Sequence, residues 1–243
     1  IRVSVLSLLK PTSLEIEVRE DASILFKDKF GESSLIDIPK AGVIKVNKGG
    51  DHIRIHWQGK DFQAVSMTMS EASIVINLLK PNRFKRSYKG EMTVYPQGND
   101  LQLVLTLARE DLVAQVVAAE MGGEEASQEA YNSLAVCVRS YIVSENSRHR
   151  RGIDFCDNTH CFLFRGLDGA FGPNGKKSLE FGKVAARVTA KRVIAFNGKP
   201  VPGYFHSCCG GRTLMPSEAW NEEKNDPYSN VVCSYCQTSS FYT

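Results

Sequence analysis

A change of hydrophobic period near residue 107 divides this chain of 243 residues. Before it, short β-branched segments such as Leu14–Val18 and Ile53–Trp57 alternate apolar and polar residues, which is typical of strands with one buried face. After it, apolar residues recur at helical spacing. We therefore expect an α+β fold with an antiparallel β-rich N-terminal half, a central helical hairpin and a C-terminal β segment flanking a cleft.

The strands that these patterns predict are short and bounded by turn residues. Gln97-Gly98-Asn99-Asp100 and Asn197-Gly198 are good hairpin turns. The predicted strands are Arg2–Leu8, Leu14–Arg19, Ile24–Lys27, Val43–Val46, Ile53–Trp57, Ala64–Met69, Ser73–Leu79, Glu91–Tyr95, Leu101–Leu105, Val184–Thr189, Val193–Phe196 and Val201–His206.

Two helices are expected between the β-rich parts. The first carries an apolar stripe from Leu112 to Met121 and should end at Gly122-Gly123. The second should run from Ser127, a plausible N-cap, to about Asn146. A polar loop and then a glycine-rich loop should follow, as far as about Lys177.

Composition excludes several classes of protein. The chain is 42% hydrophobic and 23% charged, so disordered, collagen-like and coiled-coil proteins are excluded. Its 30 Lys+Arg against 27 Asp+Glu give a net charge of only +3, which lacks the basic excess of a nucleic-acid-binding domain. No apolar run approaches the ~18 residues of a membrane-spanning helix. The first residues lack a charged segment followed by an apolar one, so we expect that any signal peptide has been removed or was never present.

Glu120 occupies an unusual position for a carboxylate. On a helical wheel it falls in the middle of the apolar stripe of the first helix. Burial and the negative end of the helix dipole both disfavour the charged form and should raise its pKa. A carboxyl that stays protonated near neutral pH can act as a general acid. Two other interpretations remain open: an ion pair with Arg139, or exposure to solvent if the helix ends before Glu120.

A loop after the second helix carries cysteine and histidine. His149, Cys156, His160 and Cys161 would together make a closed tetrahedral zinc site of the structural type. If His149 is not a ligand, water could take the fourth position. A Cys156–Cys161 disulfide and two free thiols are the alternatives without metal.

Four further cysteines lie near the C-terminus. Cys208 and Cys209 are adjacent, and Cys233 and Cys236 form a C-x-x-C motif. They could form one or two disulfides, which we favour, or a second zinc site with His206. Cys137 lies on the flank of the second helix, where we expect it to fill the core.

Several motifs together resemble the stage II sporulation protein D family. The segments Val116–Met121 and Ala130–Tyr141 are similar to its glutamate-methionine segment and arginine helix. Asp154–Cys161 matches its cysteine loop, and Ser207–Thr213 matches its serine-glycine-glycine motif. Tyr88-Lys-Gly90-Glu91 is similar to a strand of the family. The matches run from about residue 88 to the end, so we expect a β-rich subdomain over 1–87 and a catalytic domain over 88–243.

The resemblance implies a peptidoglycan lytic transglycosylase. Such an enzyme cleaves the bond between N-acetylmuramic acid and N-acetylglucosamine without water and forms a 1,6-anhydro ring. Glu120 corresponds to the catalytic glutamate of the family, and zinc held by the cysteine loop is a family feature. Arg139 and Tyr141 would orient the substrate or the glutamate. Ser140, Ser207, Gly210 and Gly211 would contact the glycan.

The family also includes amidase enhancers of bacterial cell walls. One alternative is therefore a glycan-binding module that stimulates an amidase without cleaving glycan. Another is a zinc-stabilised structural domain in which Glu120 pairs with Arg139. In each case we expect an extracytoplasmic protein, secreted or anchored to the envelope, whose partners are glycan strands and possibly an amidase.

Overall fold

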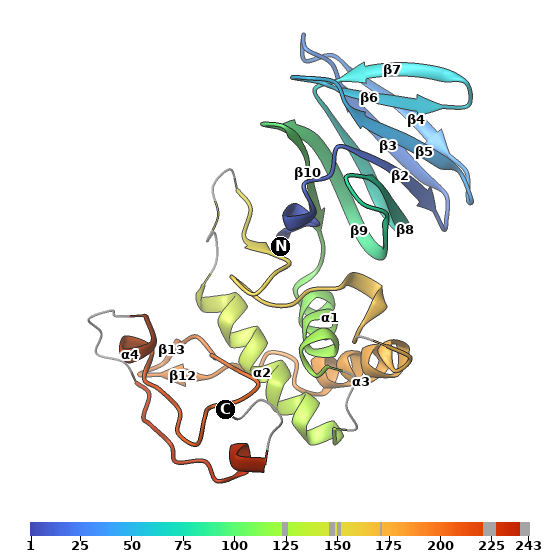
Figure 1. Cartoon of the computed structure of the whole chain (residues 1–243). Coiled ribbons are helices and arrows are strands. Elements are labelled where there is room, and N and C mark those ends of the chain that lie inside the picture. The colour runs from blue at the N-terminus through green and yellow to red at the C-terminus, as the bar shows by residue number, and fades with distance from the viewer. Residues whose placement is uncertain (123–125, 146–148, 150–151, 171, 221–226, 239–243) are drawn as a thin grey trace.

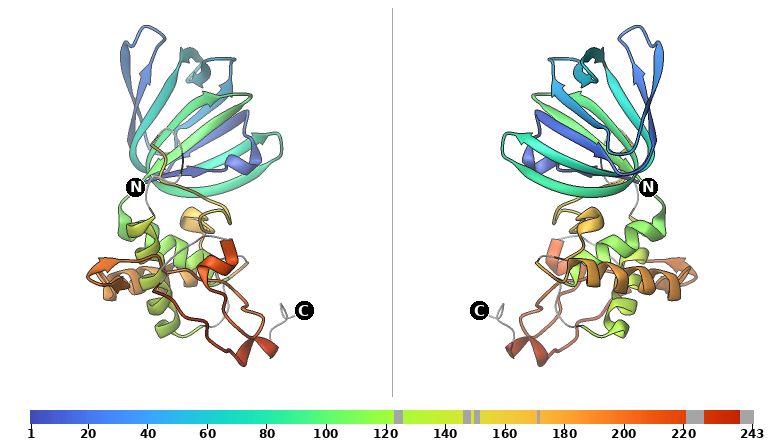
Figure 2. Two further views of the ribbon diagram at one scale, coloured as in Figure 1. Left: turned by 90° about the vertical axis from the view of Figure 1, so that its left-hand side faces the viewer. Right: turned by 90° about the vertical axis from the view of Figure 1, so that its right-hand side faces the viewer.

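The computed structural model describes residues 1–122, 126–145, 149, 152–170, 172–220 and 227–238. A large curled β-sheet forms one lobe, and helices with a long C-terminal segment form the other (Figure 1). Both side views show the sheet lobe above the helices, with the N-terminus where the two lobes meet (Figure 2). The expected α+β class is confirmed.

The sheet holds eleven strands, in the order β11-β1-β10-β9-β8-β2-β5-β6-β7, with β3 pairing β8 and β4 pairing β3. Every pair is antiparallel except β1 with β11. The strands are β1 Arg2–Val5, β2 Ser13–Val18, β3 Ala22–Lys27, β4 Ser33–Ile38, β5 Val43–Lys48, β6 Ile53–Trp57, β7 Lys60–Ala64, β8 Ser66–Lys80, β9 Phe84–Gln97, β10 Asp100–Thr106 and β11 Phe155–Cys156.

Strand β8 differs from the sequence-based prediction, which placed two strands in this region. The two strands expected over 64–69 and 73–79 are one strand, whose register with β9 shifts between Met69 and Ala72. The first part of β8 pairs with β3 and the second with β2, so the shift lets one strand serve both partners. Two edge strands, β4 and β7, were not predicted, because their sequences lack a buried alternating face.

The sheet continues beyond residue 87. That position lies inside β9, which pairs with β8 on one side and β10 on the other. The division into 1–87 and 88–243 stays a prediction.

The described residues also form four α-helices and three 3₁₀ helices: α1 Arg109–Glu120, α2 Gln128–Ser144, α3 Gly175–Val188, α4 Pro216–Trp220, η1 Ser7–Leu9, η2 Gly166–Asp168 and η3 Tyr235–Thr238. Two predicted helix boundaries are confirmed. The Ser127 side chain accepts a hydrogen bond from the Ala130 amide and caps α2. Gly122, at φ 69°, follows the end of α1. Asn146 and Gly123 lie outside the described residues.

The helix α3 contradicts the prediction of a strand over 184–189. Leu179, Gly182, Ala185 and Ala186 are buried, and this spacing belongs to a helix face. Gly182 packs directly against α1, where a methyl group would collide with the Ala114 carbonyl. The β-branched residues at the end of the segment misled the prediction, because tertiary packing outweighs strand propensity.

The C-terminal β segment is smaller than predicted. Among the described residues of this segment, the only named strands are β12 Ala195–Phe196 and β13 Lys199–Pro200, which pair around Asn197 and Gly198. Both turn residues have positive φ, so the predicted hairpin turn is confirmed. The strand expected over 201–206 is wrong: this segment has no ladder partner among the described residues, and Gly203 instead packs against the Cys137 backbone of α2.

No helix in the described part of the chain is both long and apolar enough to cross a membrane.

Candidate functional site

Glu120 is the last residue of α1, at the end of a helix that is buried all round. Every residue from 112 to 119 is buried, because α1 packs against α3, α2 and the apolar core beneath the sheet. Glu120 itself is half-buried. Its Oε1 accepts a hydrogen bond of 2.5 Å from the Leu163 amide.

Burial raises the pKa of Glu120 above its ordinary value of 4.5, and the hydrogen bond from the Leu163 amide lowers it in part. The expected direction of the shift is therefore confirmed. The helix also continues to Glu120 rather than ending before it, so the residue is not a fully exposed loop carboxylate.

Arg139 does not pair with Glu120. Its side chain is 1% exposed, and its Nη2 lies 2.6 Å from Oε2 of Glu110 at the start of α1. Further N–H groups donate to the Ala186 and Arg192 carbonyls and to the Thr189 hydroxyl. The interpretation in which Arg139 neutralises Glu120 is wrong. These contacts make Arg139 a link between α1, α2 and the end of α3.

The two residues after Arg139 are also buried. The Ser140 hydroxyl donates to the Val136 carbonyl and accepts from the Ile194 amide at 2.7 Å. Tyr141 is 5% exposed, and its ring lies within 6.3 Å of the rings of Phe155, Phe162 and Tyr204, measured between centroids. These contacts favour structural roles for both. Their predicted roles in catalysis and substrate binding stay predictions.

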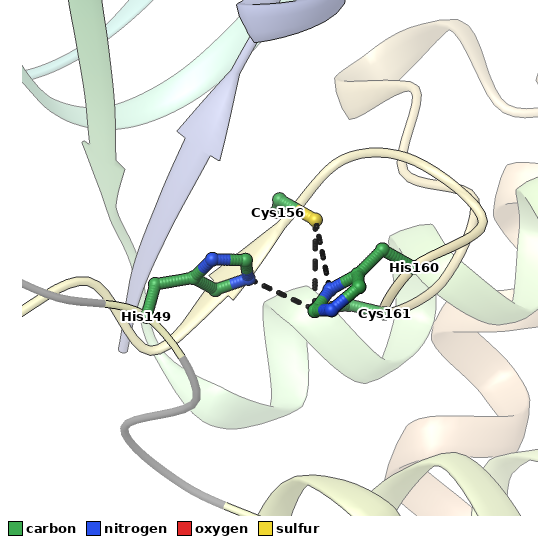
Figure 3. Close-up of side chains that lie close together, drawn as sticks. All are labelled: His149, Cys156, His160 and Cys161. Atoms are coloured by element: carbon green, nitrogen blue, oxygen red, sulfur yellow. Dashed lines mark hydrogen bonds between the residues drawn. The ribbon is translucent and has the colours of Figure 1, made fainter. Parts of the chain in front are cut away.

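The four predicted metal ligands lie together. The side chains of His149, Cys156, His160 and Cys161 converge (Figure 3), with one ligand atom of each within 4.8 Å of all the others. The two sulfurs are 3.5 Å apart. His160 Nδ1 lies 3.4 Å and His149 Nε2 lies 3.2 Å from the Cys161 sulfur. Both cysteines are free thiols.

This donor set fits a zinc ion. Zinc–sulfur distances of about 2.3 Å and zinc–nitrogen distances of about 2.0–2.1 Å in a tetrahedron place sulfurs about 3.8 Å apart and sulfur about 3.5 Å from nitrogen. The observed distances lie close to these values. The hydrogen bond with the Cys161 thiol, as the largest cause, lowers the pKa of Cys156 to about 5, which favours the thiolate that metals bind.

Two aspartates fasten this loop to the first strand of the sheet. The Asp154 carboxylate accepts from the Arg2 amide at 2.8 Å, and the Asp157 carboxylate accepts from the Leu6 amide at 2.7 Å. Between them, Cys156 lies in β11, which pairs with β1. Burial raises the pKa of Asp157 to about 6. No role was predicted for either aspartate from the sequence.

The same loop also reaches Glu120. Leu163, whose amide donates to Glu120, follows Cys161 by two residues, and Phe162 between them is buried. The candidate acid is therefore held by the backbone of the loop that carries the candidate metal ligands. Sequence reasoning missed Leu163, since a backbone donor leaves no signature in residue type.

The remaining predicted residues lie in the segment after β13. Ser207 and Gly210 are exposed, and Gly211 is half-exposed with φ 96°. A cavity of about 650 Å³ lies between β8, β9 and the start of α3. Glu120 is not among the residues that line this cavity. The cleft expected at Glu120 and the glycan contacts of the three residues stay predictions.

Together, the fold and the site define a protein with a helical domain docked on a β-sheet, a half-buried glutamate at a helix end and a Cys/His loop that contacts it. Residues 97–196 match the family model described as the stage II sporulation protein, SpoIID. This segment belongs to the SpoIID family, as the sequence motifs predicted. It contains Glu120, Arg139, Tyr141 and all four candidate metal ligands. No curated protein and no solved structure matched the chain.

Proposed function

We propose that this protein is a peptidoglycan lytic transglycosylase with Glu120 as its general acid and base. The observation that carries the proposal is the position of Glu120: a half-buried carboxyl at the end of α1, held by the Leu163 amide, inside the segment that matches the SpoIID family. Burial raises its pKa above the ordinary value. A raised pKa is the direction of shift that suits a general acid, the group that donates a proton when a glycosidic bond is cleaved.

The reaction needs one such group. The Glu120 carboxyl donates its proton to the glycosidic oxygen as the bond to C1 of the muramyl residue breaks. The resulting carboxylate then takes the proton of the muramyl O6 hydroxyl as that oxygen bonds to C1 and closes the 1,6-anhydro ring. A hydrolytic glycosidase, in contrast, uses two carboxyl groups. The Leu163 amide holds Oε1 of Glu120 and leaves Oε2 to exchange the proton.

We assign zinc to His149, Cys156, His160 and Cys161. With four protein ligands, zinc would supply structural cross-linking rather than an activated water. The cross-link would fix the loop whose Leu163 amide contacts Glu120. The proposed location is outside the cytoplasm, where the glycan substrate is found, either secreted or anchored to the envelope.

The test is product analysis on glycan strands freed of stem peptides. The parent protein should release fragments ending in 1,6-anhydro-N-acetylmuramic acid, detected by mass spectrometry. Glu120→Gln should lower the rate at least about 100-fold, the usual minimum for loss of a general acid. Glu180→Gln, an exposed glutamate on α3, is the matched control and should keep full activity.

An amidase-enhancing module would behave differently. The parent protein would bind glycan without forming anhydro ends, and Glu120→Gln would leave both binding and amidase stimulation unchanged. Such a result would refute the proposed enzyme.

A further inference from the structure

The described residues of the C-terminal segment, 190–220 and 227–238, form no hydrophobic core of their own. Among its described residues only Gly203 and Pro216 are buried, while Val232 and Tyr235 are more than 80% exposed. Its regular elements are two-residue strands, the five-residue α4 and η3. Small units that bury this little apolar surface usually depend on a cross-link, either disulfide or metal.

Backbone contacts bring two distant parts of this segment together. The Cys233 amide donates to the Gly211 carbonyl at 2.8 Å, and Arg212 forms an isolated antiparallel bridge with Val232. The contact places the turn after Cys209 beside the C-x-x-C motif. A few hydrogen bonds between exposed backbones are weak by themselves, since water competes for the same groups.

Three cysteine sulfurs meet at this contact. One ligand atom each from Cys209, Cys233 and Cys236 lies within 4.8 Å of the other two. The Cys209 and Cys236 sulfurs are 3.2 Å apart, and those of Cys233 and Cys236 are 3.9 Å apart. Sulfurs bound to one zinc ion lie about 3.8 Å apart. All three residues are free thiols.

The surrounding backbone suits thiolate ligands. The Cys209 amide lies 3.3 Å from the Cys236 sulfur and donates to it, and the Gly211 amide donates to the Cys209 sulfur. Gly210 and Gly211, both with positive φ, let the chain turn back so that amides face sulfur. Such N–H groups orient the ligands of a metal and stabilise their negative charge. The Cys208 side chain also forms a hydrogen bond with the Cys236 sulfur.

We propose that Cys209, Cys233 and Cys236 form a second zinc site, with a three-thiolate core that cross-links the C-terminal segment. The site lies outside residues 97–196 of the family match and shares no ligand with the Cys/His loop. The site joins residues 27 positions apart in the sequence. The cross-link therefore reduces the conformational entropy of the chain between them. Thiolate ligands select zinc over the hard cations magnesium and calcium.

The first experiment measures zinc in the purified full chain. Cys209→Ser and Cys236→Ser should each hold one zinc ion fewer than the parent, whatever the parent's total. Cys137→Ser is the matched control, because Cys137 lies on α2 outside both clusters, and its zinc content should equal that of the parent.

The second experiment uses the parent protein, so it does not depend on a variant that folds. Native protein is alkylated with iodoacetamide before and after zinc is chelated, and the modified cysteines are identified by mass spectrometry. Cys209, Cys233 and Cys236 should resist alkylation until the chelator is added. Alkylation of all three without chelator would overturn the proposal. Equal zinc in Cys209→Ser and the parent, or a disulfide between any two of these cysteines, would also overturn it.

Discussion

Replacement of Glu110 by alanine tests whether Arg139 has a structural role. The change removes the carboxylate that lies 2.6 Å from Nη2 of Arg139 and leaves the guanidinium, 1% exposed, without a counter-charge. Breaking a fully buried ion pair costs about 3–5 kcal/mol. Because the Glu110 side chain is 44% exposed, water already weakens the ion pair and reduces the cost of breaking it. We therefore expect Glu110→Ala to lower the free energy of unfolding by about 2–4 kcal/mol.

The assay is urea denaturation followed by circular dichroism, together with the thermal midpoint. For a chain of this size the expected loss lowers the midpoint by at least about 4 °C. Asp111→Ala is the control, because Asp111 is an exposed acidic neighbour in the same first turn, and it should change stability by no more than about 0.5 kcal/mol. Arg139→Lys should also destabilise, since lysine cannot reproduce the planar set of donors.

Two results would refute this reasoning. Equal stability of Glu110→Ala and Asp111→Ala would mean that the ion pair does not hold the helices together. Full stability of Arg139→Lys combined with loss of glycan cleavage would give Arg139 the catalytic role predicted from the sequence motif.

Three further predictions follow from the packing and the site. Gly182→Ala should destabilise the protein by about 1–3 kcal/mol in urea denaturation, because a methyl group meets the Ala114 carbonyl; the exposed Lys183→Ala should not. The raised pKa of Glu120 means that the folded state binds its proton more tightly than the unfolded state. The stability of the parent relative to Glu120→Gln should therefore be greatest below pH 4.5 and fall as pH rises through the folded-state pKa; a difference independent of pH would contradict this. Removal of the proposed zinc by a chelator should lower the thermal midpoint by roughly 5–10 °C and slow the proposed glycan cleavage, and added zinc should restore both; an unchanged midpoint would exclude a bound structural metal.

The sequence by itself determined most of the local structure. The alternation of apolar and polar residues predicted most strands of the sheet. Ser127 and Gly122 marked the expected helix boundaries, and Asn197-Gly198 marked the small hairpin. The SpoIID motifs identified the family of the central segment. These features depend on the propensity and spacing of neighbouring residues, which a sequence displays directly.

Only the tertiary structure decided which distant groups meet. It paired Arg139 with Glu110 rather than Glu120, and it placed the Leu163 amide against the candidate acid. It turned the segment at 184–189 into part of α3, because close packing on α1 outweighs its β-branched residues. Such contacts join positions far apart in the chain, and their energies depend on burial and geometry that arise only when the lobes fold together.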